Sequence, residues 1–297
     1  MNKALKKKTS HVLEFLGFTM PAAIAILLFV GIPFLMCIYY SFRKWNGIQK
    51  GSSFIGIKNY IRAFTNDSTF LDSIAYTLLY AVLAVIFINV LALFLSVILE
   101  QSKVFAKGLF RAAFYIPNII SLIIIGFVWK FIFSRAFEAI YSSTGAALFG
   151  WSWLGEPKLA VASTVLVTVW QALGFYMLIY VAGLQSVPDD VLEAATIDGA
   201  GKVRRFFSVI LPLIVPSLTV CTFYSIASSL KMFELIFTLT GGGPGSATTS
   251  VALDIYNTAF NSNQYGYGSA KSVILFILVA VITILQVTVF KEREVEA

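Results

Sequence analysis

The stretch PDDVLEAATIDGAG, residues 188–201, lies between two strongly apolar segments, LIYVAGL (178–184) and VILPLIVPSL (209–218). It brings acidic residues, alanines and a glycine into a part of the chain whose neighbouring segments are apolar enough to lie in lipid. The chain therefore leaves apolar surroundings at this stretch and soon returns to them. The fold depends on what the apolar segments are, and the function depends on why this stretch separates them.

The whole chain is too apolar for an ordinary soluble domain. Of its 297 residues, 58% are hydrophobic and 12% are charged, whereas an average soluble domain has about 25% charged residues. A soluble fold of this size could not cover so much apolar surface. We therefore expect a lipid bilayer to be the solvent for most of the chain.

Six apolar stretches are long enough to cross a bilayer. A helix needs about 20 residues to cross roughly 30 Å of hydrocarbon, and a helix satisfies its own backbone hydrogen bonds in lipid. The alternating pattern of a membrane β-barrel is absent. The sequence therefore predicts an all-α membrane protein with about six transmembrane helices, at residues 13–40, 74–99, 110–133, 159–183, 213–238 and 271–290.

The first stretch follows a basic start, MNKALKKKTSHVLEF, and so resembles a secretory signal at first sight. Its apolar run is longer than the hydrophobic region of a signal, and it ends in Tyr39–Tyr40 rather than at a small-residue cleavage site. We therefore expect a first transmembrane helix over residues 13–40, after an N-terminal tail of residues 1–12.

Basic residues predict the orientation of the spans. Four lysines precede the first span, which favours a cytoplasmic N-terminal tail and, with six spans, a cytoplasmic C-terminal tail at 291–297. Residues 41–73 then form an outer loop, and residues 74–290 form a core whose loop at 184–212 is cytoplasmic. The bias is modest, because the outer loop itself carries Arg43, Lys44, Lys50, Lys58 and Arg62.

Several functions are excluded by what the sequence lacks. The placement of lysine and arginine around membrane spans accounts for the net charge of +7, so no nucleic-acid partner is needed to explain that charge. Cys37 and Cys221 fall inside predicted spans, and with the single histidine, His11, they cannot form a disulfide framework or a metal site of normal ligand count. No catalytic triad, nucleophile elbow or pair of buried carboxylates is present. We expect neither catalytic nor metal-binding residues.

An ATP-binding loop is also absent. A Walker A motif needs G-x-x-x-x-G-K followed by serine or threonine. The glycine-rich TGGGPGSATT (240–249) has no lysine, and Gly201–Lys202 is followed by Val203. We therefore expect no cofactor on this chain, and any ATP and Mg²⁺ to be handled by another polypeptide. The segment 241–245 itself is typical of a turn-rich loop, with direct ligand contact as the alternative.

The loop at 184–212 predicts two short helices at the membrane surface. Pro188 suits the first turn of a helix, which we expect over residues 188–197. Asp198–Gly199 then predicts a turn, and KVRRFFSVI (202–210) predicts a second helix.

Two interpretations of this loop remain open on composition alone. The small side chains of Ala194 and Ala195 would let another protein approach closely, and the carboxylate of Glu193 could accept a hydrogen bond from an arginine. The other interpretation is an ordinary amphipathic connector, anchored at the inner surface by basic residues, Lys202, Arg204 and Arg205.

The loop resembles the EAA loop of binding-protein-dependent ABC importer permeases. The family pattern is Glu-Ala-Ala, then Asp-Gly-Ala, then Ile-x-Leu-Pro or a close variant. One departure is Gly201, where the family often has a serine; glycine also caps a helix, only about a few tenths of a kcal/mol less well. The chain matches the pattern at Glu193, Ala194, Ala195, Asp198, Gly199, Ala200, Phe206, Ile210, Leu211, Pro212 and Pro216.

The resemblance covers nearly the whole chain and points to the carbohydrate-importing branch of that family. FIGIKNY (54–60) is similar to the first outer loop of the branch, and FRAAFYIPNIIS (110–121), with Trp129 after it, is similar to its third helix. WLGEPKLA (153–160) is similar to the lead-in to the fourth helix. TGGGPGSATTSVALDIYNTAF (240–260) resembles the Gly-Gly-Pro outer segment that is typical of the first of two paired permeases.

The resemblance implies a type I importer architecture with several partners. In the family, helices of the EAA loop dock into a cleft on a separate ATPase subunit, where the glutamate faces basic residues. Two such ATPase subunits hold ATP and Mg²⁺, a second permease completes the pathway, and an extracytoplasmic binding protein delivers the sugar. The family works in the bilayer of bacterial or archaeal cell membranes. The resemblance thus assigns the ATPase-coupling role to Glu193, Ala194, Ala195, Asp198, Gly199 and Ala200.

Polar residues inside the predicted spans indicate where a substrate could pass. Such groups tend to face the bundle interior or a water-filled cavity, although each also suits helix–helix contact. Lys231 and Glu234 are three residues apart and are predicted to share a helix face as an ion pair. Aromatic rings and hydrogen-bonding groups, a combination that suits a sugar, come together at Trp170, Gln171 and Tyr176. The predicted pathway residues, on the fourth and fifth spans, are Gln171, Tyr176, Tyr224, Ser228, Lys231 and Glu234.

The predicted function is therefore a permease subunit of an ATP-driven ABC importer, forming half of the pathway for a sugar or related carbohydrate. One alternative is a secondary transporter driven by an ion gradient, which would favour inverted repeats and broken helices. A second alternative is a membrane scaffold without transport activity, for which the two surface helices would be only a docking site.

Overall fold

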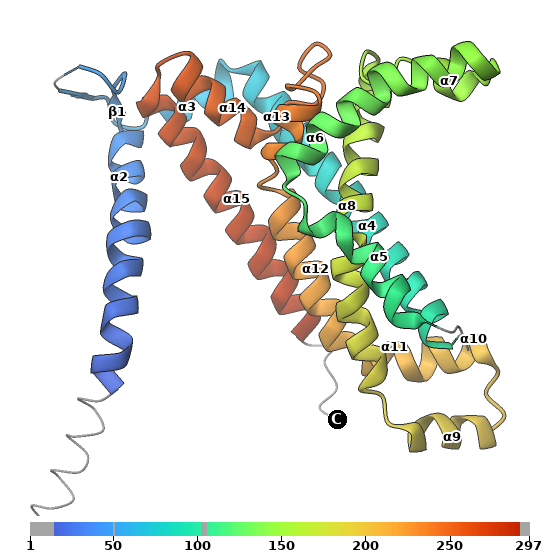
Figure 1. Cartoon of the computed structure of the whole chain (residues 1–297). Coiled ribbons are helices and arrows are strands. Elements are labelled where there is room, and N and C mark those ends of the chain that lie inside the picture. Colours follow the sequence, from blue (N-terminus) through green and yellow to red (C-terminus); the bar gives the residue numbers. More distant parts are fainter. Residues whose placement is uncertain (1–14, 50, 102–105, 292–297) are drawn as a thin grey trace, which may run out of the picture. The chain divides into compact units, whose positions relative to one another are not determined.

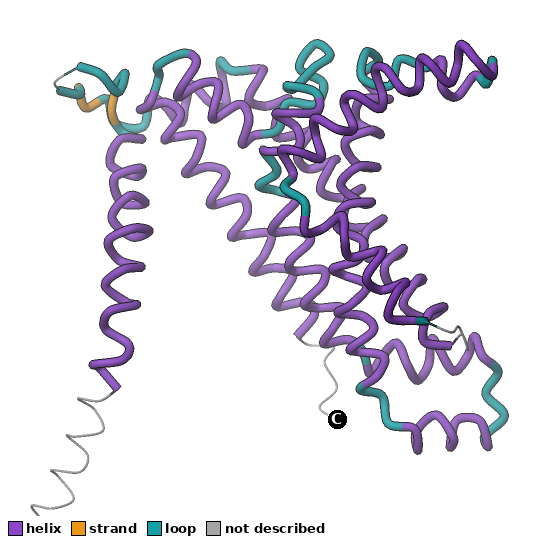
Figure 2. Tube along the Cα trace, in the orientation of Figure 1, coloured by secondary structure: helices purple, strands orange, loops and turns teal. Residues whose placement is uncertain are grey.

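The computed structural model describes residues 15–49, 51–101 and 106–291, and these ranges are almost entirely helical (Figure 1, Figure 2). The all-α membrane fold predicted from the sequence is confirmed. Within the described ranges, four helices are long and apolar enough to cross a membrane, or up to six if each of two bent helix pairs is one span. The predicted tails, 1–12 and the residues after Lys291, lie outside the described part.

The described residues form two compact units. Unit 1 is Met1–Asn66 with Ile255–Ile274, and unit 2 is Asp67–Asp254 with Leu275–Ala297. Each unit has its own internal packing.

Unit 1 begins with the first candidate span, Phe15–Ser41. A π-helical turn, η1 (Leu27–Gly31), lies within it and is followed by α2 (Ile32–Ser41). Pro33 has no N–H to donate to the carbonyl of Phe29, which favours an irregular turn at this point.

The part of unit 1 that follows the first span is folded. Strand β1 (Arg43–Lys44) pairs antiparallel with β2 (Ser53–Phe54), and the short helix α3 (Lys58–Thr65) follows. Later in the chain, unit 1 takes the end of α14 (Val251–Tyr256), the π-helical turn η5 (Asn257–Asn261) and the first part of α15 (Tyr265–Lys291), as far as Ile274.

A single amide joins three segments of unit 1. The buried Asn59 Nδ2 donates to the carbonyls of Ser41 at 2.8 Å, Arg43 at 3.1 Å and Gly266 at 3.4 Å. The Gly266 amide in turn donates to the carbonyl of Trp45 at 3.0 Å. The end of the first span, the hairpin and the start of α15 are therefore held together by one network. The predicted loop 41–73 thus contains a hairpin and a helix, and the next long helix begins at Ser68 rather than at residue 74.

Unit 2 is organised around two long helices, α4 (Ser68–Gln101) and α8 (Pro157–Gln185). The first turn of α4 is capped by the side chain of Asp67, whose Oδ1 accepts a hydrogen bond from the Phe70 amide at 2.9 Å. Pro157 begins α8, where its missing N–H is not needed.

Hydroxyl pairs show that α4 and α8 run in the same direction. The Tyr76 hydroxyl pairs with Thr164 at 3.1 Å, and the Tyr80 hydroxyl with Thr168 at 2.7 Å. Further along both helices, the Tyr180 hydroxyl donates to Asn89 Oδ1 at 2.6 Å. Because the residue numbers rise together on both helices, the helices are parallel, and the chain between them has to return from one end of the pair to the other.

The third predicted span makes this return, but it is broken. It consists of α5 (Lys107–Ile119), α6 (Leu122–Phe131), the π-helical turn η2 (Ile132–Ala136) and α7 (Phe137–Thr144), followed by the 3₁₀ turn η3 (Ala147–Gly150). The two halves meet at an angle of 94°. Ile120 and Ser121 are extended at the break, shortly after Pro117, which favours a kink. The span predicted at 110–133 is therefore not one continuous helix, because the break at residues 120 and 121 falls inside it.

The fifth predicted span, 213–238, is also interrupted. Helix α12 (Val215–Ser229) ends before residues 230–233, and α13 (Glu234–Leu239) begins after them. At its other end α12 meets the preceding helix at 71°, close to Pro212 and Pro216. The sixth span, by contrast, is continuous in α15 and begins at Tyr265, earlier than the predicted residue 271.

Glycines bring the helices of unit 2 into close contact. A Cβ on Gly174 of α8 would meet the backbone of Phe114 and Tyr115 in α5. A Cβ on Gly126 of α6 would meet the Thr238 side chain of α13. Small residues let helix backbones approach in this way, which is how helices commonly associate in lipid.

We expect Gly174→Ala to push α5 and α8 apart, because the obstructing atoms are backbone and cannot rotate away. Overpacking of this kind costs about 1–3 kcal/mol, and it should lower the melting temperature of the purified protein. Gly108→Ala in α5 is the matched control, since nothing lies within 4 Å of the added Cβ and alanine favours a helix over glycine by about 1 kcal/mol. An unchanged melting temperature for Gly174→Ala would contradict the close packing.

Candidate functional site

The stretch at 188–201 forms the predicted pair of short helices. Helix α9 (Asp189–Ile197) follows Pro188, and a second helix runs through α10 (Lys202–Arg205), the π-helical turn η4 (Phe206–Ile210) and α11 (Leu211–Leu213). Asp189 and Asp190 lie in the first turn of α9, where the helix dipole favours negative charge. The second helix extends to Leu213, beyond the predicted end at residue 210.

The turn between these helices depends on one glycine. Gly199 has a φ of 75°, a conformation that residues with a Cβ resist. Its amide donates to the carbonyl of Thr196 at 3.1 Å, and the Ala200 amide donates to the carbonyl of Ala195 at 3.0 Å, so the last carbonyls of α9 are satisfied. Gly201 precedes α10 as its N-cap residue, and its carbonyl accepts a hydrogen bond from the Arg205 amide at 2.9 Å.

The apolar sides of both short helices pack against the longer helices of unit 2. Val187, Ile210 and Ile214 are buried together, and Leu192 of α9 and Phe206 of η4 pack against them. Arg205 Nη1 also donates to Thr196 Oγ1 across the two helices at 3.2 Å. The pair of helices is therefore packed against the spans.

The opposite side of the pair is exposed. Glu193, Ala194, Asp198 and Gly199 are exposed, while Ala195 and Ala200 are half-buried. Ile197, at the end of α9, is 86% exposed. A surface that combines a carboxylate, small side chains and a bare apolar side chain is suited to close docking of another protein. The structure thus brings all six residues of the predicted coupling site into one short segment.

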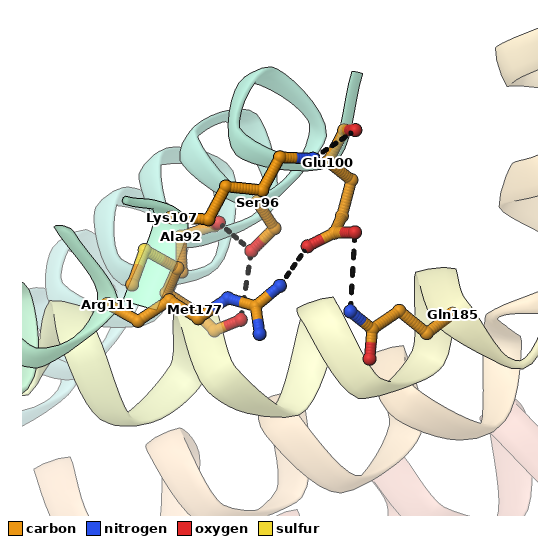
Figure 3. Close-up of polar contacts among 7 residues, drawn as sticks. All are labelled: Ala92, Ser96, Glu100, Lys107, Arg111, Met177 and Gln185. Carbon is orange, nitrogen blue, oxygen red and sulfur yellow. Dashed lines mark hydrogen bonds and ion pairs between the residues drawn. The ribbon is translucent and has the colours of Figure 1, made fainter. Parts of the chain in front are cut away.

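A charged clamp ties the ends of three helices close to this segment (Figure 3). Glu100, near the end of α4, forms an ion pair with Arg111 of α5. Its other carboxylate oxygen accepts a hydrogen bond from Gln185 Nε2, the last residue of α8, at 3.3 Å. Lys107 Nζ donates to the Glu100 carbonyl at 2.9 Å. The clamp was not foreseen from the sequence, although opposite charges at the facing ends of the second and third spans were a signal for it.

A cavity of about 370 Å³ lies between the clamp and the two short helices. Glu100 and Gln185 line it on the side of the clamp, and Asp189, Arg205 and Phe206 line it on the side of the short helices. The cavity therefore borders both the clamp and α9.

The predicted pathway residues divide into buried and exposed groups. Gln171 is buried, and Tyr176 is only 2% exposed, so both contact other helices of this chain. Tyr224 of α12 is 52% exposed, with its ring centroid 5.3 Å from that of Phe175 and 6.2 Å from that of Tyr176. Ser228 is half-buried one turn further along α12. The structure therefore brings Tyr176, Tyr224 and Ser228 to one place between α8 and α12.

Lys231 and Glu234 do not behave as predicted. Lys231 lies in the break after α12, and Glu234 begins α13, so they do not share a helix face. Both side chains are exposed, and no ion pair joins these two described residues. Their expected pairing is wrong because the fifth span is not a continuous helix.

Asn89 of α4 holds this part of the bundle together. Its Nδ2 donates to Ser225 Oγ of α12 at 3.0 Å, while its Oδ1 accepts from the Tyr180 hydroxyl of α8 at 2.6 Å. One side chain thus joins three helices, and Asn89 is best understood as a structural residue.

The glycine-rich loop at 240–250 is tightly ordered by its own hydroxyls. Thr248 Oγ1 donates to the Gly243 carbonyl at 2.6 Å, and Thr249 Oγ1 donates to the Gly242 carbonyl at 3.1 Å. Ser250 Oγ donates to the Met232 carbonyl in the break after α12 at 2.7 Å. The loop is therefore a packed element that supports the break.

The fold is that of a multi-span membrane protein with a pair of short surface helices between two of its spans. The family model of binding-protein-dependent transport system inner membrane components matches residues 92–293. The chain belongs to this family.

Several relatives match over almost the whole chain. A probable starch degradation products transport system permease protein from Thermoanaerobacterium thermosulfurigenes is 40% identical over 94% of each chain. A multiple sugar-binding transport system permease protein from Streptococcus mutans is 35% identical over 91% of this chain and 92% of its own. A trehalose/maltose transport system permease protein from Thermococcus litoralis is 33% identical over 99% of each.

A solved structure shares the fold. The crystal structure of a bacterial ABC transporter involved in the import of alginate contains a chain with a TM-score of 0.82 and 20% identity, covering 97% of this chain and 99% of its own. Family membership decides in favour of an importer permease over an ion-gradient-driven transporter, even though the third and fifth spans are broken.

We expect the clamp to contribute to stability. Glu100→Gln and Arg111→Gln should each lower the melting temperature of the purified protein, because a partly buried charged group would lose its partner, at about 1–3 kcal/mol. The double variant should lose less than the sum of the two, with a coupling of about 0.5–3 kcal/mol. Strictly additive losses would contradict a direct interaction between these side chains.

Proposed function

We propose that this chain is one of two permease subunits of an ATP-driven importer for a carbohydrate. The observation that carries the proposal is the exposed surface of α9, with Glu193 and Ala194 uncovered on helices that are fixed to the spans. Family membership and three relatives named for starch products, multiple sugars and trehalose/maltose support the substrate class.

The short helices would transmit motion from separate ATPase subunits. ATP and Mg²⁺ are bound and ATP is hydrolysed on those two subunits, and this chain supplies the surface that they hold. Glu193 meets a basic side chain there, because an exposed carboxylate gains most from a charge-assisted hydrogen bond. Since α9 is fixed to α4 and α8 through the buried cluster around Ile210 and Ile214, movement of α9 reaches the spans directly.

The orientation follows from this role. The segment 184–212 faces the cytoplasm, as do both tails, and unit 1 carries the outer face between the first and second spans. An extracytoplasmic binding protein delivers the carbohydrate to that face, as the solved complex of a bacterial alginate ABC transporter with its periplasmic protein illustrates for another system. A second permease completes the pathway in the membrane of a bacterial or archaeal cell.

The substrate pathway runs along α8 and α12. The exposed ring of Tyr224 beside Phe175 offers an aromatic surface to a sugar, and Ser228 offers a hydroxyl. Gln171 and Tyr176 are buried in α8, and the Tyr176 ring centroid lies 6.2 Å from that of Tyr224. Lys231 and Glu234 lie further along, at the exposed break and the start of α13.

We expect Glu193→Lys to uncouple ATP hydrolysis from uptake. Loss of a charge-assisted hydrogen bond, worth about 1.5–3 kcal/mol, should weaken docking at least about tenfold, so less substrate should be imported per ATP hydrolysed. The measurement is uptake and phosphate release in proteoliposomes that contain the assembled transporter, with membrane insertion checked separately.

Asp190→Lys is the control, since it makes the same change of charge on the same exposed helix. It should keep most of the coupling. Equal losses in both variants would show that the overall charge of the segment matters and not Glu193. Normal coupling in Glu193→Lys would rule out the docking role.

We expect Tyr224→Ala to weaken transport without destabilising the protein, because half of this side chain is exposed. Loss of an aromatic contact of about 0.5–1.5 kcal/mol should raise the KM for uptake two- to tenfold. Phe223→Ala, one position along α12 and also exposed, removes a ring of similar size from a different side of the helix and should leave the KM unchanged. Unchanged uptake by Tyr224→Ala would argue against a pathway at this place.

A further inference from the structure

Unit 1 holds a basic cavity that the proposed function does not use. The cavity has a volume of about 790 Å³, and Lys44, Lys58 and Arg62 all line it. These three residues come from β1 and from both ends of α3, so the fold of unit 1 gathers them from separate places.

The charge of this cavity is not balanced within unit 1. Its described residues, 15–49, 51–66 and 255–274, include five basic side chains and no acidic one. Neither Lys44 nor Lys58 makes an ion pair with any described residue of the chain. Like charges held close together raise the energy of the folded unit, so an external anion would be stabilising here.

Arg62 is held in place for such an anion. Its Nη1 donates to Gln264 Oε1 at 2.8 Å, and its Cζ lies 4.1 Å from the centroid of the Tyr267 ring. A guanidinium carries five N–H donors in a rigid plane, so this contact with Gln264 leaves others for a ligand. An arginine fixed by stacking loses little freedom when it binds an oxyanion.

The aromatic rings of the cavity already have partners within the chain. Trp45 stacks on Tyr40 with centroids 4.2 Å apart, and one face of Tyr267 is covered by Arg62. The groups left to meet a ligand are cations and side-chain amides such as that of Asn263. The cavity is therefore suited to an anion more than to a neutral carbohydrate.

The position of the cavity along the chain identifies the source of the anion. Lys44 and Trp45 follow directly on the first span, which ends at Ser41, and Tyr267 lies in the first turn of α15. Tyrosine and tryptophan gather at span ends because their rings prefer the depth of the lipid headgroups. Tyr39, Tyr40, Trp45, Tyr265 and Tyr267 place the cavity at that depth, where lipid phosphates lie.

We propose that this cavity binds the phosphate of an anionic lipid headgroup through Lys44, Lys58 and Arg62. This ligand explains why the loop that is predicted to face outward carries so many basic residues, against the usual distribution of lysine and arginine around membrane spans. The inference does not depend on which substrate is transported.

The test uses the full-length chain, assembled with its partner subunits, in phosphatidylcholine nanodiscs that contain increasing amounts of phosphatidylglycerol. Native mass spectrometry measures the phosphatidylglycerol retained. The triple variant Lys44→Gln/Lys58→Gln/Arg62→Gln should bind this lipid about a hundredfold more weakly, on the basis of the attraction per basic residue at a membrane surface. The control Lys130→Gln/Arg135→Gln/Lys158→Gln removes the same charge elsewhere and should bind it normally.

A second arm adds inorganic phosphate to phosphatidylcholine nanodiscs and measures the melting temperature. If phosphate raises the melting temperature of the wild type and the control but not that of the triple variant, the cavity is a phosphate site whose ligand is free phosphate. Equal lipid binding by wild type and triple variant, or equal losses in both triple variants, would overturn the proposal. The proposal would also be overturned if the triple variant kept its preference for phosphatidylglycerol but bound an acidic extracytoplasmic protein more weakly, because the cavity would then be a protein-docking site.

Discussion

The parallel packing of α4 on α8 is the constraint on which the rest of unit 2 depends. It is maintained by buried polar pairs, Tyr76 with Thr164, Tyr80 with Thr168 and Asn89 with Tyr180. In lipid a helix pair gains little from the hydrophobic effect, so interhelical hydrogen bonds and close packing have to provide the specificity. The three pairs fix both the direction and the register of the two helices.

Other features follow from this register. Because the two helices point the same way, their ends lie together, and Glu100 can reach Gln185 while it pairs with Arg111. The coupling segment starts directly after Gln185, so it leaves the bundle at the clamped end. In the proposed function, a force on α9 would therefore act on helices that are already joined by an ion pair and an apolar cluster.

Much of this architecture could be predicted from the sequence. The long apolar runs predicted α4, α8 and α15, because length and composition alone determine whether a helix can span lipid. Pro188, Asp198 and Gly199 predicted the two surface helices, since the signals for a helix start and a turn are local. The residues with the expected coupling role could be chosen from one short motif, and that role stays a prediction.

The breaks in the third and fifth spans could not be predicted in this way. Pro117 lies in an apolar run, and proline is tolerated in spans where neighbouring groups satisfy the freed backbone. The break at 230–233 contains no proline, and its Met232 carbonyl is satisfied by Ser250 from a distant loop. The clamp could not be predicted for a related reason, because the contact between Glu100 and Gln185 can be inferred only when the direction of α8 relative to α4 is known.

The short length of α12 has a consequence for the fifth span. Its 15 residues rise about 22 Å at 1.5 Å per residue, which is less than the roughly 30 Å of a hydrocarbon core. The remaining depth is taken up by the break, by α13 and by a loop of glycines and threonines. Irregular backbone at that depth persists only where protein or water surrounds it. Here the cover is protein, because Leu230, Met232 and Leu235 are all buried, so this part of the fifth span depends on neighbouring segments of the chain and not on lipid for its stability.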